Sequence, residues 1–296
     1  MSIFKLSPVT ESFEWGGEKL KDYGIEVDGS VAQAWELCAN GENQPEIVTG
    51  PFAGMKLGRY LEEHKDAAGE LAKQYDYFPL TVKLVDNQKL TALQVNPDPD
   101  KIHLIYVLDA KEDALIYYGF NESVTREALE EKVQDGSLNE LIRSVKVKAG
   151  DSFLIEPGTV FAIGEDVQYV SIQQDSPLKE FTFEQVLDAV NLDVKNMEDE
   201  EEQEAVDDGQ AITTMLANTD VFATFKTVCD GEVTINQEED SFGSLLLIDG
   251  TAVISLGNET IHAKKGDSLF IDAGTRDIRI VGNCTYLYTF LSENDD

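Results

Sequence analysis

The chain has 296 residues, of which 42% are hydrophobic, and a formal net charge of −34 from 57 acidic and 23 basic residues. This composition is typical of a globular protein with a real core, and the negative field argues against nucleic acid and anionic membrane surfaces as partners. No apolar run approaches the roughly 20 residues that a membrane-spanning helix needs. The N-terminus shows no secretory signal, and the three widely separated cysteines predict reduced thiols and a cytoplasmic protein.

The first two thirds of the chain alternate short strands with a few helices. Apolar runs bounded by turn residues predict strands over Leu80–Val85, Leu104–Leu108, Leu115–Tyr118, Ser152–Ile155 and Tyr169–Ile172. Helix-forming composition predicts helices over Leu57–Tyr75, Thr125–Val133, Leu138–Arg143 and Thr182–Val190. Thr125 and Thr182 are expected to act as N-caps.

The acidic segment Met197–Gly209 marks the clearest boundary in the chain. A block of like charges repels itself and buries no apolar surface, so we expect a solvated, mobile linker rather than a binding tract for a basic partner. We therefore predict an N-terminal domain over residues 1–195 with a helical insertion near 121–144. A linker over 196–210 and a C-terminal barrel over 211–296 complete the expected organisation.

The C-terminal third consists of strands separated by turn dipeptides. The expected turns are Asp249-Gly250, Gly257-Asn258, Lys265–Asp267 and Gly282-Asn283. The expected strands are Val221–Thr227, Ser244–Ile248, Ala252–Leu256, Ser268–Ile271, Ile278–Val281 and Tyr286–Leu291. Regular spacing of this kind favours a sandwich or barrel.

Two segments, one on each side of the acidic block, share the pattern K-x-G-D-S-φ-φ-I-[ED]-x-G-T, where φ is apolar. They are Lys148–Thr159 and Lys264–Thr275. Each places a Gly-Asp turn, a buried strand and a second glycine turn in the same order. Because this hairpin is typical of small cupin barrels, we predict a mainly β fold of two tandem cupin-like (jelly-roll) barrels with a small helical insertion.

Seven motifs occur in the order found in short bacterial type I mannose-6-phosphate isomerases, which the chain resembles over essentially its whole length. They are Trp15–Gly17, Phe78–Asp86, Leu93–Pro97, Tyr106–Asp109, Val145–Asp151, Pro157–Gly164 and Gln173-Gln174. The resemblance implies a zinc enzyme that interconverts mannose 6-phosphate and fructose 6-phosphate through an enediol. In that family zinc is held by Gln and His of a Q-V-H-P motif, Glu of a K-x-E motif and His of a G-T-x-H-A motif.

This sequence departs from the family at three of those four positions. The Q-V-H-P motif reads Gln94–Pro97, with Asn96 in place of His, and the K-x-E motif reads Lys101–His103, with His103 in place of Glu. Phe161 stands where the G-T-x-H-A motif has its His. The remaining donors are one imidazole and two neutral amides, whereas zinc favours three or four thiolate, imidazole or carboxylate ligands. We therefore expect no bound metal, and zinc only if the family function is retained.

Other family positions are altered as well. The family's catalytic Arg aligns near Phe181, a Gly-Glu pair reads Ala32-Gln33, and a His reads Asn40. A buried Gln94, hydrogen-bonded to Asn96 or a neighbour, would account for its retention without metal. Cys38 is expected to be buried and inert, and His64 and His262 to be surface or structural residues.

Two lysines that contact substrate in the family, Lys83 and Lys101, are retained. With Gln94 and His103 they are the candidates for binding a small anionic sugar phosphate. No residue is assigned a catalytic role. The preferred hypothesis is a degenerate isomerase homologue that binds a sugar phosphate without catalysis.

The alternative is an active isomerase that has rebuilt its metal site around Gln94 and His103 with Asp98 or Asp100. A third possibility is a protein-interaction module that uses the acidic tract. A barrel plugged by Phe161 would favour that module, and an open pocket with Lys83 and Lys101 would favour ligand binding.

Overall fold

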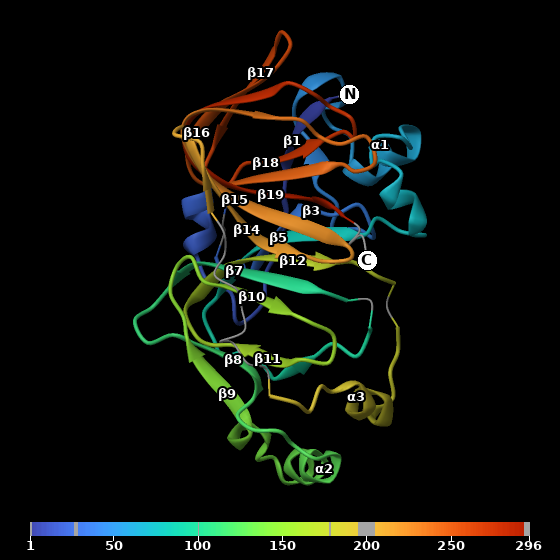
Figure 1. Cartoon of the computed structure of the whole chain (residues 1–296), viewed down its shortest axis with the longest axis vertical. Coiled ribbons are helices and arrows are strands. Elements are labelled where there is room, and N and C mark those ends of the chain that lie inside the picture. The colour runs from blue at the N-terminus through green and yellow to red at the C-terminus, as the bar shows by residue number, and fades with distance from the viewer. Residues whose placement is uncertain (1, 27–28, 100, 178, 195–204, 293–296) are drawn as a thin grey trace.

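A computed structural model describes residues 2–26, 29–99, 101–177, 179–194 and 205–292 of the chain. Within these residues the protein consists mainly of β-strands, as the sequence predicts, and the strands form three antiparallel sheets. Figure 1 shows them stacked along the long axis: the C-terminal strands at one end, β5, β7 and β12 in the middle, and β8, β9 and β11 towards α2 and α3 at the other end. No helix in the described ranges is long and apolar enough to cross a membrane.

The C-terminal strands form most of a nine-stranded sheet in the order β13-β14-β15-β19-β16-β18-β1-β4, with β17 paired to β16. The N-terminal strands β1 and β4 belong to it because β1 pairs with β18. The bounds are β1 Ile3–Ser7, β4 Glu46–Ile47, β13 Ala205–Asp207, β14 Ala211–Asn218, β15 Phe222–Ile235, β16 Gly243–Leu256, β17 Glu259–Lys264, β18 Ser268–Ile271 and β19 Ile278–Leu291. The first strand of the chain therefore completes the sheet built by the last strands.

The six-stranded sheet, in the order β10-β7-β12-β5-β3-β2, and the four-stranded sheet, in the order β6-β11-β8-β9, belong to the N-terminal part. The bounds in the first are β2 Val9–Glu11, β3 Gln33–Leu37, β5 Leu80–Asn87, β7 His103–Ala110, β10 Ser152–Ile155 and β12 Val167–Gln174. Those in the second are β6 Gln94–Val95, β8 Leu115–Phe120, β9 Ile142–Lys146 and β11 Val160–Ile163. Ile105, Ile116 and Phe153 belong to one buried cluster that includes residues of both sheets.

The α-helices are short: α1 Leu57–Glu63, α2 Arg126–Asp135 and α3 Phe183–Ala189. The predicted N-caps are confirmed, since Thr125 Oγ1 accepts from Ala128 N at 3.2 Å and Thr182 forms a capping box with Gln185. Two helix predictions are wrong in extent. The helix predicted over Leu57–Tyr75 ends at Glu63, and the rest of that range contains only a short 3-10 helix over Leu71–Gln74.

The predicted helix Leu138–Arg143 is a 3-10 turn over Leu138–Glu140 followed by strand β9. Ile142 of β9 pairs with Phe120 of β8, so sheet pairing overrides the local helix preference. The predicted helical insertion therefore contains a strand as well as a helix.

Two predicted turns lie inside long strands. Asp249-Gly250 is part of β16, where the register with β19 shifts between Leu247 and Asp249, and Gly250 adopts a φ of 74°. Gly282 is part of β19, and a Cβ there would lie 2.3 Å from Thr251 O of the neighbouring strand. These glycines mark a bulge and a close backbone approach rather than chain reversals.

The two repeat segments adopt the same local structure. Asp151 accepts a hydrogen bond from Lys148 N at 2.9 Å, and Asp267 accepts one from Lys264 N at 2.8 Å. Each turn leads into a strand of equal length, β10 or β18. Residues 195–204, which include most of the acidic segment Met197–Gly209, lie outside the described residues, so its predicted mobility and the domain boundary there stay predictions. Ala205–Asp207 forms the edge strand β13.

Candidate functional site

A pocket of about 670 Å³ opens among strands of the six-stranded and four-stranded sheets. Its polar residues include Lys83 from β5, His103 from β7 and Ser171 from β12, and Lys101 precedes β7. Val95 of β6 and Phe161 of β11 add apolar wall. The pocket is therefore open despite Phe161, which is the outcome that favours ligand binding over an inert barrel.

Strand register sets the polar floor of the pocket. Lys83 is the register partner of Trp35 on one side and of Ser171 on the other, so these three residues form one row across β3, β5 and β12. In the next row, Gln173 pairs with His103. Since alternate residues of a strand share a face, pairing brings the two rows to the same surface.

The four positions that the resemblance assigns to zinc, Gln94, Asn96, His103 and Phe161, all line this pocket. Gln94 and Phe161 are register partners, and the ring centroids of Phe161 and His103 lie 5.9 Å apart in a T-shaped arrangement. His103 Nε2 is 2.9 Å from Ser171 Oγ. Burial, with a smaller contribution from the charge of Lys83, lowers the pKa of His103 to about 3, so its imidazole is neutral at physiological pH.

These residues do not fit a zinc ion. His103 Nε2 already hydrogen-bonds Ser171, and Phe161 offers no donor atom. In the described part of the chain, no group of three His, Cys, Asp or Glu residues is placed to hold a metal ion. Asp98, proposed as a replacement ligand, is buried and contacts Lys179 Nζ at 2.9 Å and Ser176 Oγ at 3.3 Å instead. Asp100 lies outside the described residues. The donor set therefore does not support the metal that the fold family uses.

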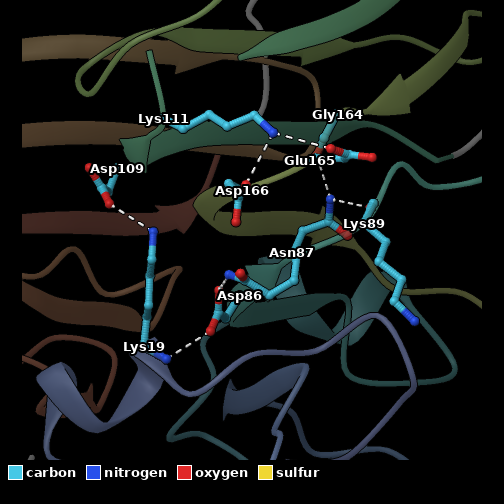
Figure 2. Close-up of polar contacts among 10 residues, drawn as sticks. Lys19, Asp86, Asn87, Lys89, Asp109, Lys111, Gly164, Glu165 and Asp166 are labelled. Atoms are coloured by element: carbon cyan, nitrogen blue, oxygen red, sulfur yellow. Dashed lines mark hydrogen bonds and ion pairs between the residues drawn. The ribbon is translucent and has the colours of Figure 1, made fainter. Parts of the chain in front are cut away.

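The pocket lining carries positive charge, although the protein as a whole is strongly negative. Lys83 and Lys101 are part of it, and no Asp or Glu is among the described residues that line it. Figure 2 shows the contrasting situation outside the pocket, where Lys19 contacts Asp109 at 3.2 Å and Lys111 contacts both Glu165 and Asp166 at 3.1 Å. Lys19 and Lys111 are neutralised by carboxylates, whereas the pocket keeps a positive lining.

The polar network in Figure 2 also holds one rim of the pocket. Asn87 Nδ2 donates to Lys89 O at 2.8 Å and to Gly164 O at 2.6 Å, which fixes the chain just before the rim residues Leu90 and Thr91. Neighbouring Asp86 is fully buried and accepts from Lys19 N at 2.8 Å. Trp15, stacked on Phe13 with centroids 5.4 Å apart, lines the pocket as well.

Several predicted positions differ from expectation. Gln94 is an exposed residue on the pocket wall rather than a buried amide, because two-residue strand β6 pairs only with β11. Asn96 Oδ1 accepts from Asp98 N rather than from Gln94. Phe181 is half-buried and does not line the pocket. Asn40 donates to Asp175 at 2.7 Å.

The remaining predicted residues take structural or surface places. Cys38 is buried, as expected, and burial raises the pKa of its thiol. His64 Nδ1 lies 3.0 Å from Tyr60 O, and His262 is exposed on β17. Ser171 and Trp35 escaped the sequence analysis as site residues, because only the register between strands places them beside Lys83.

Comparisons with a family model and with curated proteins both find similarity to mannose-6-phosphate isomerases. The family model "Mannose-6-phosphate isomerase, cupin domain" matches residues 211–291. The chain is 26% identical to the mannose-6-phosphate isomerase ManA of Bacillus subtilis over 93% of this chain and 94% of that protein. It is 25% identical to the Streptococcus mutans mannose-6-phosphate isomerase over 87% and 88% of the two chains. The chain is thus similar to bacterial mannose-6-phosphate isomerases over most of its length, and its C-terminal part matches their cupin-domain model.

Solved structures of the family share its fold. The mannose 6-phosphate isomerase of Bacillus subtilis superposes with a TM-score of 0.88 at 24% identity, covering 98% of this chain and 99% of that one. A mutant phosphomannose isomerase from Salmonella typhimurium gives 0.82 at 17% identity, covering 99% and 100%. The chain thus shares the fold of these isomerases.

Proposed function

We propose that this protein binds a phosphorylated sugar in the pocket without zinc and without isomerising it. The observation that carries the proposal is the lining itself: two lysines and no described carboxylate, in a chain with a net charge of −34. A phosphate dianion entering elsewhere would meet a repulsive field, whereas Lys83 and Lys101 offer local positive charge. The amides of Gln94, Asn96 and Gln173 supply hydrogen-bonding groups for sugar hydroxyls.

Isomerisation needs more than this lining provides. Moving a proton between C1 and C2 requires a base and an electrophile that stabilises the developing enediolate oxygens. The basic groups here are the two lysine amines and the imidazole of His103, whose pKa of about 3 makes it a weak base. The donor set lacks the anionic ligands that would hold a divalent electrophile.

Metal analysis with an activity assay is the direct test. We expect purified protein to carry no stoichiometric zinc and to produce no fructose 6-phosphate from mannose 6-phosphate, even after zinc is added. Elemental analysis and a coupled assay against a zinc-containing family isomerase would measure both. Stoichiometric zinc with turnover would overturn the proposal in favour of a rebuilt active site.

Ligand binding is tested by calorimetric titration with mannose 6-phosphate. We expect Lys101→Ala and Lys83→Ala each to weaken binding by about tenfold to a hundredfold, since a hydrogen bond to a charged group contributes roughly 1.5–3 kcal/mol. Lys111→Ala is the matched control, because Lys111 pairs with carboxylates outside this pocket. Equal affinity in all four proteins would contradict the proposal.

A further inference from the structure

Lys83 is a half-buried lysine, and no carboxylate in the described part of the chain contacts its amine. Its Nζ lies 3.6 Å from the ring centroid of Trp35, its register partner on β3. Across the described ranges, no ion pair or hydrogen bond joins Lys83 to a carboxylate, unlike Lys19 and Lys111 in Figure 2. An amine in this position faces the pocket rather than a counter-ion.

Glu11, the carboxylate with the largest electrostatic effect on Lys83, is engaged by other residues. Its carboxylate accepts hydrogen bonds from Trp35 Nε1 at 2.8 Å, from Asn43 Nδ2 at 2.7 Å and from Gln33. These three donors hold the carboxylate, and no hydrogen bond or ion pair joins it to Lys83 in the described part of the chain, so Glu11 acts on Lys83 only through space. The amine therefore keeps its hydrogen-bonding capacity for whatever enters the pocket.

Burial shifts the protonation equilibrium of Lys83 towards the neutral amine. Desolvation lowers the pKa of Lys83, although the charge of Glu11 opposes it, and the like charge of Lys101 adds to the lowering. A neutral lysine amine is a nucleophile towards carbonyl carbon, and partial desolvation of this kind is a common way to activate it.

Groups that can move a proton lie beside the amine. Ser171 is the register partner of Lys83 on β12, so their Cβ atoms are about 5 Å apart in an antiparallel pair. Ser171 Oγ in turn hydrogen-bonds His103 Nε2 at 2.9 Å. The neutral imidazole and the hydroxyl form a pair through which a proton can pass to or from an oxygen attached near Lys83.

We propose that Lys83 condenses reversibly with the open-chain carbonyl of a phosphorylated aldose or aldehyde, whose phosphate Lys101 holds, to form a Schiff base in the pocket. The Nζ lone pair forms the bond to the carbonyl carbon, and the carbonyl oxygen takes a proton to give a carbinolamine. That oxygen then leaves as water while the C–N double bond forms, so no oxidant or reductant is involved. The inference rests on the proposed binding of phosphorylated sugars.

Reductive trapping tests the inference. The protein is incubated with glyceraldehyde 3-phosphate, an open-chain phosphorylated aldehyde, and treated with sodium borohydride before intact-mass analysis and peptide mapping. We expect one adduct per chain, located at Lys83, and less adduct at any exposed lysine, since a lowered pKa raises the neutral fraction of the Lys83 amine. Lys83→Arg keeps the charge and is expected to abolish trapping, while Lys111→Arg is expected to trap normally.

The outcomes separate this inference from the proposed function. If wild-type protein binds mannose 6-phosphate by calorimetry but gives no more adduct than Lys83→Arg, the Schiff base is disproved and the proposed binding stands. Suppose instead that adduct forms at Lys83 equally well with unphosphorylated glyceraldehyde and that calorimetry shows no binding of mannose 6-phosphate. The reactivity of the amine is then confirmed, and the proposed phosphate recognition is disproved. Adduct spread over exposed lysines overturns the inference. Mapping of the wild-type adduct decides the matter even if Lys83→Arg folds poorly.

Discussion

A variant with Asn96→His, His103→Glu and Phe161→His is expected to bind one zinc ion per chain under conditions in which the wild-type protein binds none. The substitutions add two imidazoles and a carboxylate around a pocket where Gln94 and Phe161 are register partners and Phe161 lies 5.9 Å from His103. With the Gln94 amide this is a sufficient tetrahedral donor set. We expect an affinity gain of at least about a thousandfold, roughly 4 kcal/mol, measured by competition with a chromophoric chelator and by elemental analysis.

Phe161→His alone is the matched control for this variant. It pairs one new imidazole with His103, whose Nε2 is committed to Ser171, so we expect only weak zinc binding. If the triple variant binds no more zinc than the single one, the four positions do not converge as a ligand set. The absence of metal would then reflect pocket geometry rather than the loss of donor atoms, and the chemical argument for a zinc-free site would fail.

The sequence was informative about the fold because its strand signals are strong and its repeat is local. Ser152–Ile155 and Ser268–Ile271 are predicted with their observed bounds, since each follows a Gly-Asp turn whose Asp side chain caps the reversal. Errors arose where tertiary pairing competes with local preference. Strand β9 was missed because it is extended through pairing with β8, and Phe120, the partner of Ile142, lies more than twenty residues away in the sequence.

The chemistry of the site could be predicted better than its geometry. Residue types alone indicated that Asn96 and Phe161 cannot replace imidazole ligands. What could not be predicted is that Ser171 meets His103, or that Trp35 lies under the amine of Lys83, because both contacts depend on register between strands far apart in sequence. The absence of described carboxylates from the lining also emerges only once the strands are paired.

On the opposite face of β3 lies a carboxyl group that the pocket does not use. Glu36 is fully buried, and neither of its carboxylate oxygens has a hydrogen-bond partner among the described residues. Its backbone oxygen accepts from Ser268 Oγ on β18 at 3.2 Å, at a contact between the six-stranded and nine-stranded sheets. Burial first, and then the negative charge of Asp267, raises the pKa of Glu36 well above its usual range.

Glu36→Gln is expected to raise the stability of the protein at pH 8 by about 2 kcal/mol or more, because an ionised carboxylate at this site is desolvated and unpaired. The folded-state pKa is raised, so the wild-type penalty is absent below the unfolded pKa of about 4.5 and grows as pH rises through the folded pKa. Between the unfolded-state and the folded-state pKa of Glu36, the free energy of unfolding of the wild-type protein falls by about 1.4 kcal/mol per pH unit. Urea unfolding of both proteins at pH values between 5 and 9 measures the difference.

The pH dependence distinguishes this cause from a general gain in packing. Gln is isosteric with Glu, so the two stability curves should converge towards acidic pH, where Glu36 is protonated in both states, and separate as pH rises. Glu46→Gln on β4, at an exposed position, should run parallel to wild type throughout. A constant offset between Glu36→Gln and wild type at every pH would mean that ionisation of Glu36 is not the source. A loss of stability at pH 8 would mean that the carboxylate is solvated or paired in solution.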